Sequence, residues 1–402
     1  MKKIILQTLT VLCLSVFIVA KTNAQNVGIN ATGALPDASA MLHVDAGTKG
    51  FLVTGTSGGA VPDLGAGSRL MFYPGKSAFR AGSVSGSQWN DINTGQFSVA
   101  MGNGTIASGS SATALGSNTT ASGINSTALG TFTFASAPNS TAMGSNTVAS
   151  AINSTALGNT TIASGGNSTA LGNNTIASGF NSTALGNNTI ASGFNSTALG
   201  NNTNASGINS TAMGSFVSTN NRIGAFIIGD ALGSGSMSTA DNQMTMGFAG
   251  GYRLFSNSSA TVAVSLPANG NAWLSISDVN RKENFEPLDG EDVLQKFSKI
   301  NFTSWNYKQQ DPKIYRHYGI MAQDFYKAFG HDQFGAIGND TTVNPIDMIG
   351  IDMTAIQALE KRTTDLKAEN EILKASVGEL QRKFAAQQKL IDQILIDTKK
   401  QK

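Results

Sequence analysis

The chain has 402 residues and a formal net charge of +2, and its 27 basic and 25 acidic residues are unevenly distributed. After Val279 lie 18 of the basic and 18 of the acidic residues, so the two thirds of the chain before it are nearly neutral. Basic residues with interleaved aromatics form no stripe, which argues against nucleic acid as a partner.

The first 24 residues have the features of a secretory signal. Two lysines precede an apolar run over residues 4–20, and small side chains follow it up to Ala24. This pattern predicts export and cleavage after Ala24. The single cysteine, Cys13, lies within the signal, so the mature chain forms no disulfide. No later segment reaches the roughly 18 apolar residues that span a bilayer, so no transmembrane segment is expected in the mature chain.

Residues 25–96 are predicted to form a separate, β-rich N-terminal module. Three short runs have strand-forming residues and are separated by glycine and proline, at residues 26–30, 39–45 and 49–53. His43 lies in one of these runs without a Cys, His or Glu cluster nearby in the sequence, so we assign it a structural role. Trp89 is predicted to join the module to the next region. The module resembles the N-terminal segments of secreted Bacteroidetes fibre proteins.

Between residues 97 and 220 the sequence repeats a 14-residue unit. The glycine of each Ala-x-Gly step recurs nine times, at positions 102, 116, 130, 144, 158, 172, 186, 200 and 214. The unit is too short for a helical hairpin, whereas its two runs of alternating side chains suit one coil of a parallel β-solenoid. Glycine or asparagine stands where each coil must turn. Nine coils predict a rod on the order of 40 Å long.

The repeats are free of charge, with no Asp, Glu, Lys or Arg from Gln96 to Asn221. Stacked coils place the same residue above itself about every 4.8 Å, so one charged position would become a ladder of like charges. Asn, Ser and Thr occupy these positions instead. Because these residues are uncharged, they are expected to stack and to share hydrogen bonds along the rod.

The first strand of each coil has two different faces. Ser126, Ala128 and Gly130 lie on one face, and Thr127 and Leu129 point to the other. The first face is almost without side chains, so we expect sister chains to pack closely along it. One Leu or Met and one Ile per coil bury little apolar surface within one chain, which favours oligomerisation.

The order Ser-x-Ala-x-Gly, followed by a second strand containing alanine, resembles the head repeats of YadA-like trimeric adhesins. The resemblance covers about a third of the chain. It implies a mainly β fold, a trimeric left-handed parallel β-roll of 14-residue repeats. Such rods serve as adhesin heads, phage fibre shafts and spacers, so the resemblance leaves the function of the rod open.

After the repeats, residues 221–276 return to aromatic and β-branched runs and are interpreted as a β-rich stalk. The composition then changes abruptly at residues 277–285 from neutral to charged. This segment holds the one catalytic candidate, Ser277 with Lys282, because a lysine that has lost its proton can activate a serine hydroxyl. Residues five apart do not align on one helix face. On spacing alone, a Ser-Asp helix cap followed by a solvated lysine is the alternative.

Three downstream motifs favour the catalytic interpretation. They occupy residues 300–308, 317–325 and 351–357. In this order they resemble the peptidase S74 family, the intramolecular chaperone domain of endosialidase-type tailspikes, over residues 275 to about 375. The resemblance implies an α+β chaperone domain, which we place at 277–358, that drives trimerisation and folding of the fibre before it and then cuts itself off once.

The family motif Ser-Asp-x-x-x-Lys falls on Ser277, Asp278 and Lys282. The resemblance implies that Ser277 attacks the carbonyl of Ile276, with Lys282 as the base and Asp278 in support. Cleavage between Ile276 and Ser277 would leave a fibre that ends at Ile276 and a released chaperone.

Two further residues, Arg281 within this motif and His317 downstream of it, each have two possible roles. Many relatives carry Arg-Leu before the lysine, where this chain has Asn280-Arg281. Arg281 is either surface charge or a cation that helps to lower the pKa of Lys282. His317 invites a triad with Ser277, and the alternative is that it orders the Gly-Ile-Met-Ala-Gln turn after it. No metal-ligand spacing surrounds His331, and neither a metal nor a cofactor is expected.

Residues 359–402 are predicted to form a C-terminal trimeric coiled coil. One seam has Leu or Ile at 359, 366, 373, 380 and 394, and the alternate seam uses 363, 370, 377, 384 and 391. Asn370 on this seam would fix the register at some cost in stability. The alternative is a lone amphipathic helix. Three such helices would gather three chains before the roll folds, which matters because near-identical coils can pair in the wrong register.

The favoured hypothesis is a secreted or cell-surface homotrimeric fibre, adhesin-like, that matures by self-cleavage. A prophage tail fibre or spike shares both parts, but phage fibres assemble in the cytoplasm, so the signal argues against it. In a third hypothesis the Thr- and Asn-rich surface of the roll binds a regular surface such as ice or glycan. No external substrate is predicted, because no acid pair stands out. The repeats do not identify a host, cell-surface or glycan ligand.

Overall fold

A computed structural model describes residues 26–230 and 235–400. The predicted signal over residues 1–24, with Cys13, lies outside the described residues. The chain divides into two compact units, one up to Ser275 and the other from Ile276 onward. In the described part of the chain, no helix has the length and apolar character needed to cross a membrane.

The N-terminal module contains two small strand pairs. Strand β1 (Val27–Asn30) pairs in parallel with β2 (Leu42–Asp45), and these strands lie within the first two predicted runs. The third run, at residues 49–53, forms no strand in the single chain, contrary to the prediction. Strand β3 (Gly67–Tyr73) then pairs antiparallel with β4 (Ala78–Val84), through the 3-10 turn η1 (Pro74–Lys76). A second 3-10 turn, η2 (Asp91–Asn93), precedes the repeats.

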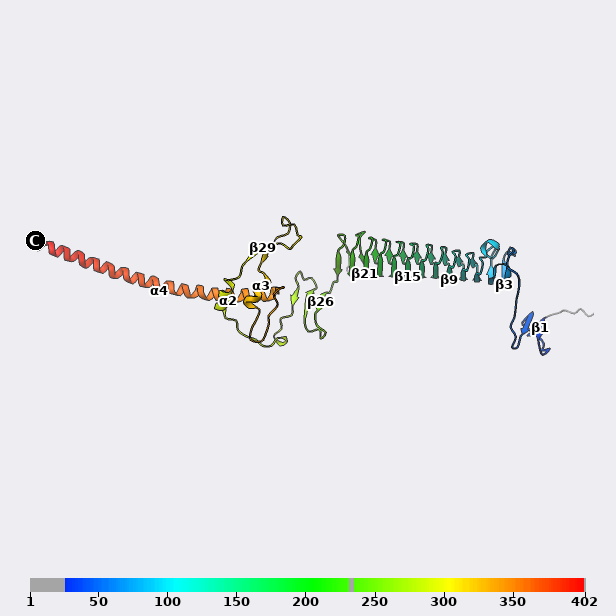
Figure 1. Ribbon diagram of the computed structural model, residues 1–402, viewed down its shortest axis with the longest axis horizontal. Helices are drawn as coiled ribbons and strands as arrows, with labels where there is room; N and C mark the ends of the chain where they lie inside the picture. The colour runs from blue at the N-terminus through cyan, green and yellow to red at the C-terminus, as the bar shows by residue number, and fades with distance from the viewer. Residues whose placement is uncertain (1–25, 231–234, 401–402) are drawn as a thin grey trace, which may run out of the picture. The chain divides into compact units, whose positions relative to one another are not determined.

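Each 14-residue repeat forms one coil with a five-residue and a two-residue strand, and the coils stack as a parallel roll (Figure 1). The longer strands are β5 (Val99–Asn103), β7 (Thr113–Ser117), β9 (Thr127–Thr131), β11 (Thr141–Ser145), β13 (Thr155–Asn159), β15 (Thr169–Asn173), β17 (Thr183–Asn187), β19 (Thr197–Asn201) and β21 (Thr211–Ser215). The shorter strands are β6 (Ile106–Ala107), β8 (Thr120–Ala121), β10 (Phe134–Ala135), β12 (Val148–Ala149), β14 (Ile162–Ala163), β16 (Ile176–Ala177), β18 (Ile190–Ala191), β20 (Asn204–Ala205) and β22 (Val217–Ser218). Every pairing is parallel and joins equivalent residues, as Thr127 with Thr141.

Both sheets extend beyond the repeats. Strand β4 continues the long-strand sheet at its N-terminal side, and β23 (Phe226–Gly229) and β25 (Met244–Gly247) continue it at the other. Strand β24 (Ser236–Met237) extends the short-strand sheet. Coil stacking therefore continues past residue 220 into the segment interpreted as a stalk. Strands β26 (Gly251–Phe255), β27 (Ala263–Pro267) and β28 (Leu274–Ser275) form a separate antiparallel sheet.

Small side chains fill the inside of the roll. Ala128 of the long strand and Ala135 of the short strand are both fully buried, as are their equivalents in the other repeats. Ser126 is also buried, and its hydroxyl donates to the Gly123 carbonyl at 2.7 Å. The small face is thus the interior of the coil in a single chain, and the expectation that sister chains pack along it is wrong. Leu129 points outward instead.

Glycine is required at the end of each long strand. Gly130 has a φ of +123°, and a Cβ there would lie 2.0 Å from the carbonyl oxygen of Gly144 in the next coil. Such an overlap with backbone cannot be relieved by moving a side chain. The strict glycine period is therefore a consequence of close coil-to-coil approach.

Asparagine turns one corner of every coil from Asn125 onward and forms the predicted ladder. Asn125 has a φ of +56°, a left-handed conformation that asparagine tolerates better than most residues. Its side-chain amide donates to the Oδ1 of Asn139 at 3.1 Å. The same bond repeats from coil to coil through Asn153, Asn167, Asn181, Asn195 and Asn209. Shared side-chain hydrogen bonds along the rod are confirmed.

Two large side chains close the N-terminal end of the roll. Arg80 stands in the interior alanine column, paired with Ala100, and is fully buried. Its guanidinium donates to the carbonyls of Ser98 at 3.0 Å and Ala107 at 3.2 Å, and burial lowers the pKa of Arg80 to about 10. Trp89 is buried as well and donates to the Thr105 carbonyl at 2.9 Å. Trp89 thus joins the module to the repeats.

The second unit is a small α+β arrangement followed by one long helix. Its elements are the 3-10 turn η3 (Val279–Arg281), α2 (Gly290–Phe297), β29 (Thr303–Trp305), β30 (His317–Gly319), α3 (Ala322–Phe329) and α4 (Pro345–Lys400). Its core joins Val293, Phe325, Ile351 and Ala355 from the three helices. The fold is therefore mainly β, with a parallel roll followed by an α+β unit.

Candidate functional site

Ser277 and Lys282 meet across a tight turn. The Asp278 carboxylate accepts hydrogen bonds from the backbone N–H and the side-chain amide of Asn280, each at 3.0 Å, and so begins η3. Lys282 ends the same turn in extended backbone. The turn brings the Lys282 Nζ to 2.8 Å from the Ser277 Oγ. A 3-10 turn between two extended residues therefore joins side chains that a regular α-helix of the same spacing would separate.

The Asp278 carboxylate interacts with the polar and charged side chains around the turn. Hydrogen bonds from Asn280, first from its backbone and then from its side chain, keep the pKa of Asp278 below its ordinary value, and nearby Arg281 acts in the same direction. The Arg281 Nε lies 4.0 Å from Asp278 Oδ2. Asp278 is therefore an anion that shapes the turn through its contacts with Asn280 and Arg281.

Both members of the pair are exposed to solvent in the single chain. A serine hydroxyl becomes a nucleophile when a neighbouring base takes its proton, and a lysine is such a base only when neutral. Removal from water is the usual way to favour the neutral amine. The distance between Lys282 Nζ and Ser277 Oγ suits proton transfer, whereas the exposure of both residues does not favour a neutral amine.

His317 lies in a different environment. It belongs to β30, where it is the cross-strand partner of Trp305, with ring centroids 4.7 Å apart. The Tyr307 ring lies 5.8 Å from the His317 ring and 5.0 Å from that of Trp305, so the three rings form one cluster. Among the described residues, no hydrogen bond joins His317 to Ser277 or Lys282. Its observed contacts favour the structural alternative over membership of a triad.

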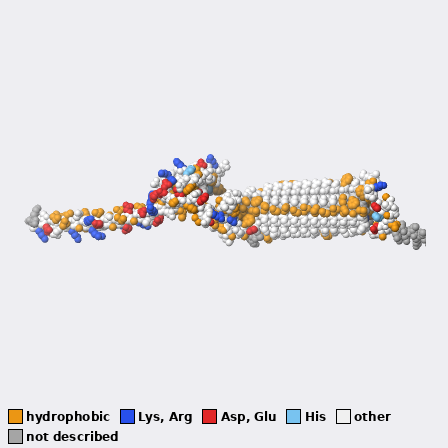
Figure 2. Space-filling model, turned by 90° about the horizontal axis from the view of Figure 1, so that it is seen from below, with side chains coloured by type: hydrophobic (Ala, Val, Ile, Leu, Met, Phe, Trp, Pro, Cys, Tyr) orange, Lys and Arg blue, Asp and Glu red, His pale blue; other side chains and the backbone are white. Residues whose placement is uncertain are grey.

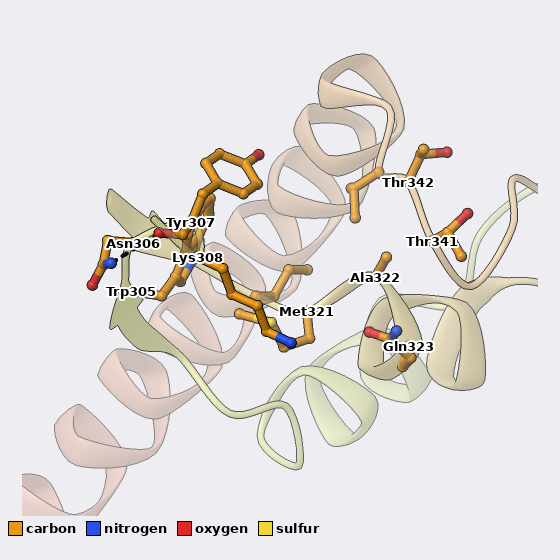
Figure 3. Close-up of a pocket in the computed structure, with 11 residues that line it drawn as sticks. Trp305, Asn306, Tyr307, Lys308, Met321, Ala322, Gln323, Thr341 and Thr342 are labelled. Carbon is orange, nitrogen blue, oxygen red and sulfur yellow. Dashed lines mark hydrogen bonds between the residues drawn. The ribbon is translucent and has the colours of Figure 1, made fainter. Parts of the chain in front are cut away.

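A cavity of about 660 Å³ opens beside this hairpin. Trp305 and Tyr307 line it from one side and Thr341 and Thr342 from another, with Met321 between them (Figure 3). The motifs at 300–308 and 317–325 supply many of its lining residues. Sequence reasoning quoted these motifs without predicting a cavity, because residues distant in the chain form it. Ser277 and Lys282 do not line it.

The outer side of the roll carries a continuous apolar column. We define the leucine column as the outward Leu or Met of each long strand, namely Met101, Leu115, Leu129, Met143, Leu157, Leu171, Leu185, Leu199 and Met213. A hydrophobic stripe follows the length of the roll (Figure 2). Each member is partly exposed in the single chain, Met101 the most at 43%.

Within residues 26–230 and 235–400, no cluster of three or more His, Cys, Asp or Glu suits a metal ion.

Two family models match the chain. The YadA head domain repeat matches in overlapping segments from residue 94 to residue 216. The peptidase S74 model, described as a chaperone of endosialidase, matches residues 277–332 and so includes Ser277 and Lys282. No curated protein matches the chain. The chain is therefore an adhesin- or tail-fibre-like protein in which YadA-type head repeats precede a chaperone domain of the endosialidase type.

Proposed function

We propose that the protein is an exported homotrimeric fibre, adhesin-like, whose C-terminal chaperone domain assembles it and then cuts itself off between Ile276 and Ser277. The observation that carries this proposal is the 2.8 Å contact between Lys282 Nζ and Ser277 Oγ. The scissile bond lies one residue after Ser275, where the first compact unit ends. A cut at this place would separate the two units without dividing either core.

The reaction would begin with transfer of the Ser277 hydroxyl proton to a neutral Lys282. The Ser277 oxygen attacks the carbonyl carbon of Ile276, and the C–N bond between the two residues breaks. Lys282 returns the proton to the departing Ser277 amine, which leaves an ester between Ile276 and the Ser277 oxygen. Water then hydrolyses this ester. The products are a fibre that ends in the Ile276 carboxylate and a chaperone fragment that begins with Ser277.

Three copies would cover the apolar surface that one copy leaves in water. Along the roll this surface is the leucine column, which faces outward in every repeat. In α4 it is the predicted heptad seam, where Leu359, Leu366 and Leu373 are all exposed. Contiguous apolar surface of this extent on a single chain is typical of an interface. Three α4 helices joined along this seam would form the proposed coiled coil.

Trimer assembly also supplies the missing condition for cleavage. Ser277 and Lys282 are exposed in the single chain, whereas the lysine must be neutral to act. Cover by sister chains would favour the neutral amine only after assembly. The order of events then follows, because the chaperone would remain attached until the fibre has trimerised.

The test compares wild type with Ser277→Ala and Lys282→Ala by intact mass and denaturing gel, with the oligomeric state measured by analytical ultracentrifugation. We expect wild type to be cut after Ile276, Ser277→Ala to remain intact, and Lys282→Ala to slow cleavage at least about 100-fold. Lys299→Ala, at another lysine of the same unit, is the control and should cleave normally. A wild-type trimer that stays full length would refute self-cleavage and leave only the chaperone role.

A second candidate function is binding of a regular surface by the roll. It is favoured by the exposed asparagine ladder, in which amides recur once per coil in hydrogen-bonded order. Their spacing of about 4.8 Å would suit a periodic ligand such as ice or a glycan chain. Ice-recrystallisation and glycan-array assays on the fibre decide this, with Asn153→Leu and Asn167→Leu as ladder variants. Binding that the variants do not weaken would rule the ladder out.

A further inference from the structure

The parallel sheet β1–β2 is incomplete in the single chain. It has only two strands, so each strand has one edge without a strand partner among the described residues. On one face, Val27, Ile29 and Leu42 are 52%, 58% and 57% exposed. On the opposite face, Pro36 of the following loop packs against Gly28. The exposed apolar face and the two open edges show where this sheet lacks a partner.

Physical considerations make such a sheet marginal by itself. Two-stranded sheets gain little stability in water, and parallel pairs are slightly weaker than antiparallel ones. Parallel sheets in proteins are normally covered on both faces. The module therefore needs either another strand or another layer.

A suitable strand exists in the same module without a partner. Residues 50–54 are in no strand, and within the described chain their backbone groups make no hydrogen bond. Phe51, Leu52 and Val53 are 77%, 81% and 47% exposed. Their β-branched and aromatic composition favours a strand, as the sequence predicts. An unpaired apolar segment and an unpaired sheet edge are complementary in both backbone and side chains.

We propose that residues 50–54 of one chain add as a strand to an open edge of the β1–β2 sheet of a sister chain. The proposal rests on the homotrimer proposed above, which provides one open sheet and one unpaired segment per chain, so that every segment finds a site. Within one chain, the turn at Ala46–Lys49 leads from β2 into the segment without pairing them. Main-chain bonds would supply affinity, and apolar contacts with Val27, Ile29 and Leu42 would add specificity.

Hydrogen exchange on the full chain, with analytical ultracentrifugation in parallel, tests this strand addition. We expect the amides of Phe51, Leu52 and Val53 to exchange at least about 100-fold more slowly than in an unstructured peptide. A trimer in which these amides exchange freely would overturn the strand addition and leave the homotrimer standing. A monomeric chain would overturn both.

Two substitutions extend the exchange measurement. Leu52→Asp is expected to remove the protection of residues 50–54 while the trimer persists, because the roll and α4 hold the chains together. Leu35→Asp, at an exposed site in the loop between β1 and β2, is the matched control and should leave the protection unchanged. Equal loss of protection in both variants would contradict a specific strand contact.

Engineered cysteines then identify which chain supplies the strand. The one cysteine of the sequence, Cys13, precedes the predicted cleavage site, so added pairs report without interference. Val27→Cys with Leu52→Cys should form a disulfide between chains on a non-reducing denaturing gel if the strand adds at the β1 edge, and Leu42→Cys with Leu52→Cys should do so if it adds at the β2 edge. Leu35→Cys with Leu52→Cys is the control and should not. Disulfides within one chain would overturn the proposal in favour of an intramolecular hairpin.

Discussion

The roll and the C-terminal unit differ in which of their groups a single chain buries. In the roll, alanine fills the interior, the buried Ser126 hydroxyl is satisfied within its own coil, and Arg80 closes one end. In the C-terminal unit, the Ser277–Lys282 pair and the apolar seam of α4 remain exposed. The roll thus buries its interior within one chain and leaves its outer leucine column exposed, whereas in the C-terminal unit the candidate Ser277–Lys282 pair itself is exposed.

Gly158→Ala should produce the largest loss of stability, because it forces an overlap between two stacked coils of the roll. The new Cβ would lie 1.9 Å from the carbonyl oxygen of Gly172, at a φ of +127°. We expect destabilisation of more than about 4 kcal/mol, measured by chemical unfolding. Gly350→Ala, in α4 where a Cβ meets nothing within 4 Å, is the control in the other unit. Similar losses in both would contradict the contrast between the units.

Leu171→Asp tests whether the exposed leucine column is the interface between sister chains. If the leucine column contacts sister chains, each trimer would bury unpaired carboxylates, at about 3–5 kcal/mol each. Sedimentation should then show dissociation. Ile152→Asp places the same charge at an exposed corner of a coil, outside the leucine column, and should leave the trimer intact. Trimers that tolerate Leu171→Asp would move the interface to another face.

Arg80→Met should weaken the closed end of the roll. It keeps apolar volume but removes the charged donor from the buried carbonyls of Ser98 and Ala107, which retain only one backbone N–H donor each. We expect a loss of about 2–3 kcal/mol in unfolding free energy. Arg69→Met, on the neighbouring strand β3, is the control because Arg69 is only partly buried. A loss no greater than the control's would show that Arg80 does not cap the roll.

Glu291→Gln should have the smallest effect. Arg362 donates two hydrogen bonds of 3.1 Å to its carboxylate, which keep the pKa of Glu291 below its ordinary value. A depressed pKa adds stability above the unfolded-state value and loses it as pH falls through the folded-state value. The variant should therefore melt slightly below wild type near neutral pH. The difference should shrink below about pH 4. A pH-independent difference would contradict this pairing of α2 with α4.

Much of the roll was predictable because every coil has the same constraints on its turns and on stacking against the next coil. The glycine period, the absence of charge and the asparagine ladder each follow from stacking one residue on its equivalent. The direction of the small face was not predictable from alternation alone. Alternation separates Ala128 from Leu129, but only the opposite strand, with Ala135, determines which of them lies inside.

The candidate site was predictable as a pair of residues and not as a geometry. The motif placed Ser277 and Lys282, while the turn that joins them depends on Asp278 and its bonds with Asn280. The cavity beside Trp305 was missed, because it is lined by segments that lie far apart in the chain.

The sequence by itself determined the period of the coils, the residues that turn them and the identity of the Ser-Lys pair, since these depend on neighbours along the chain or on exact repetition. Tertiary structure decided which face of the coil is buried, that Arg80 closes the roll, that the coils continue past residue 220, and that residues 50–54 have no partner within one chain. These properties depend on which segments pack against one another, and the same local sequence pattern is compatible with more than one such packing.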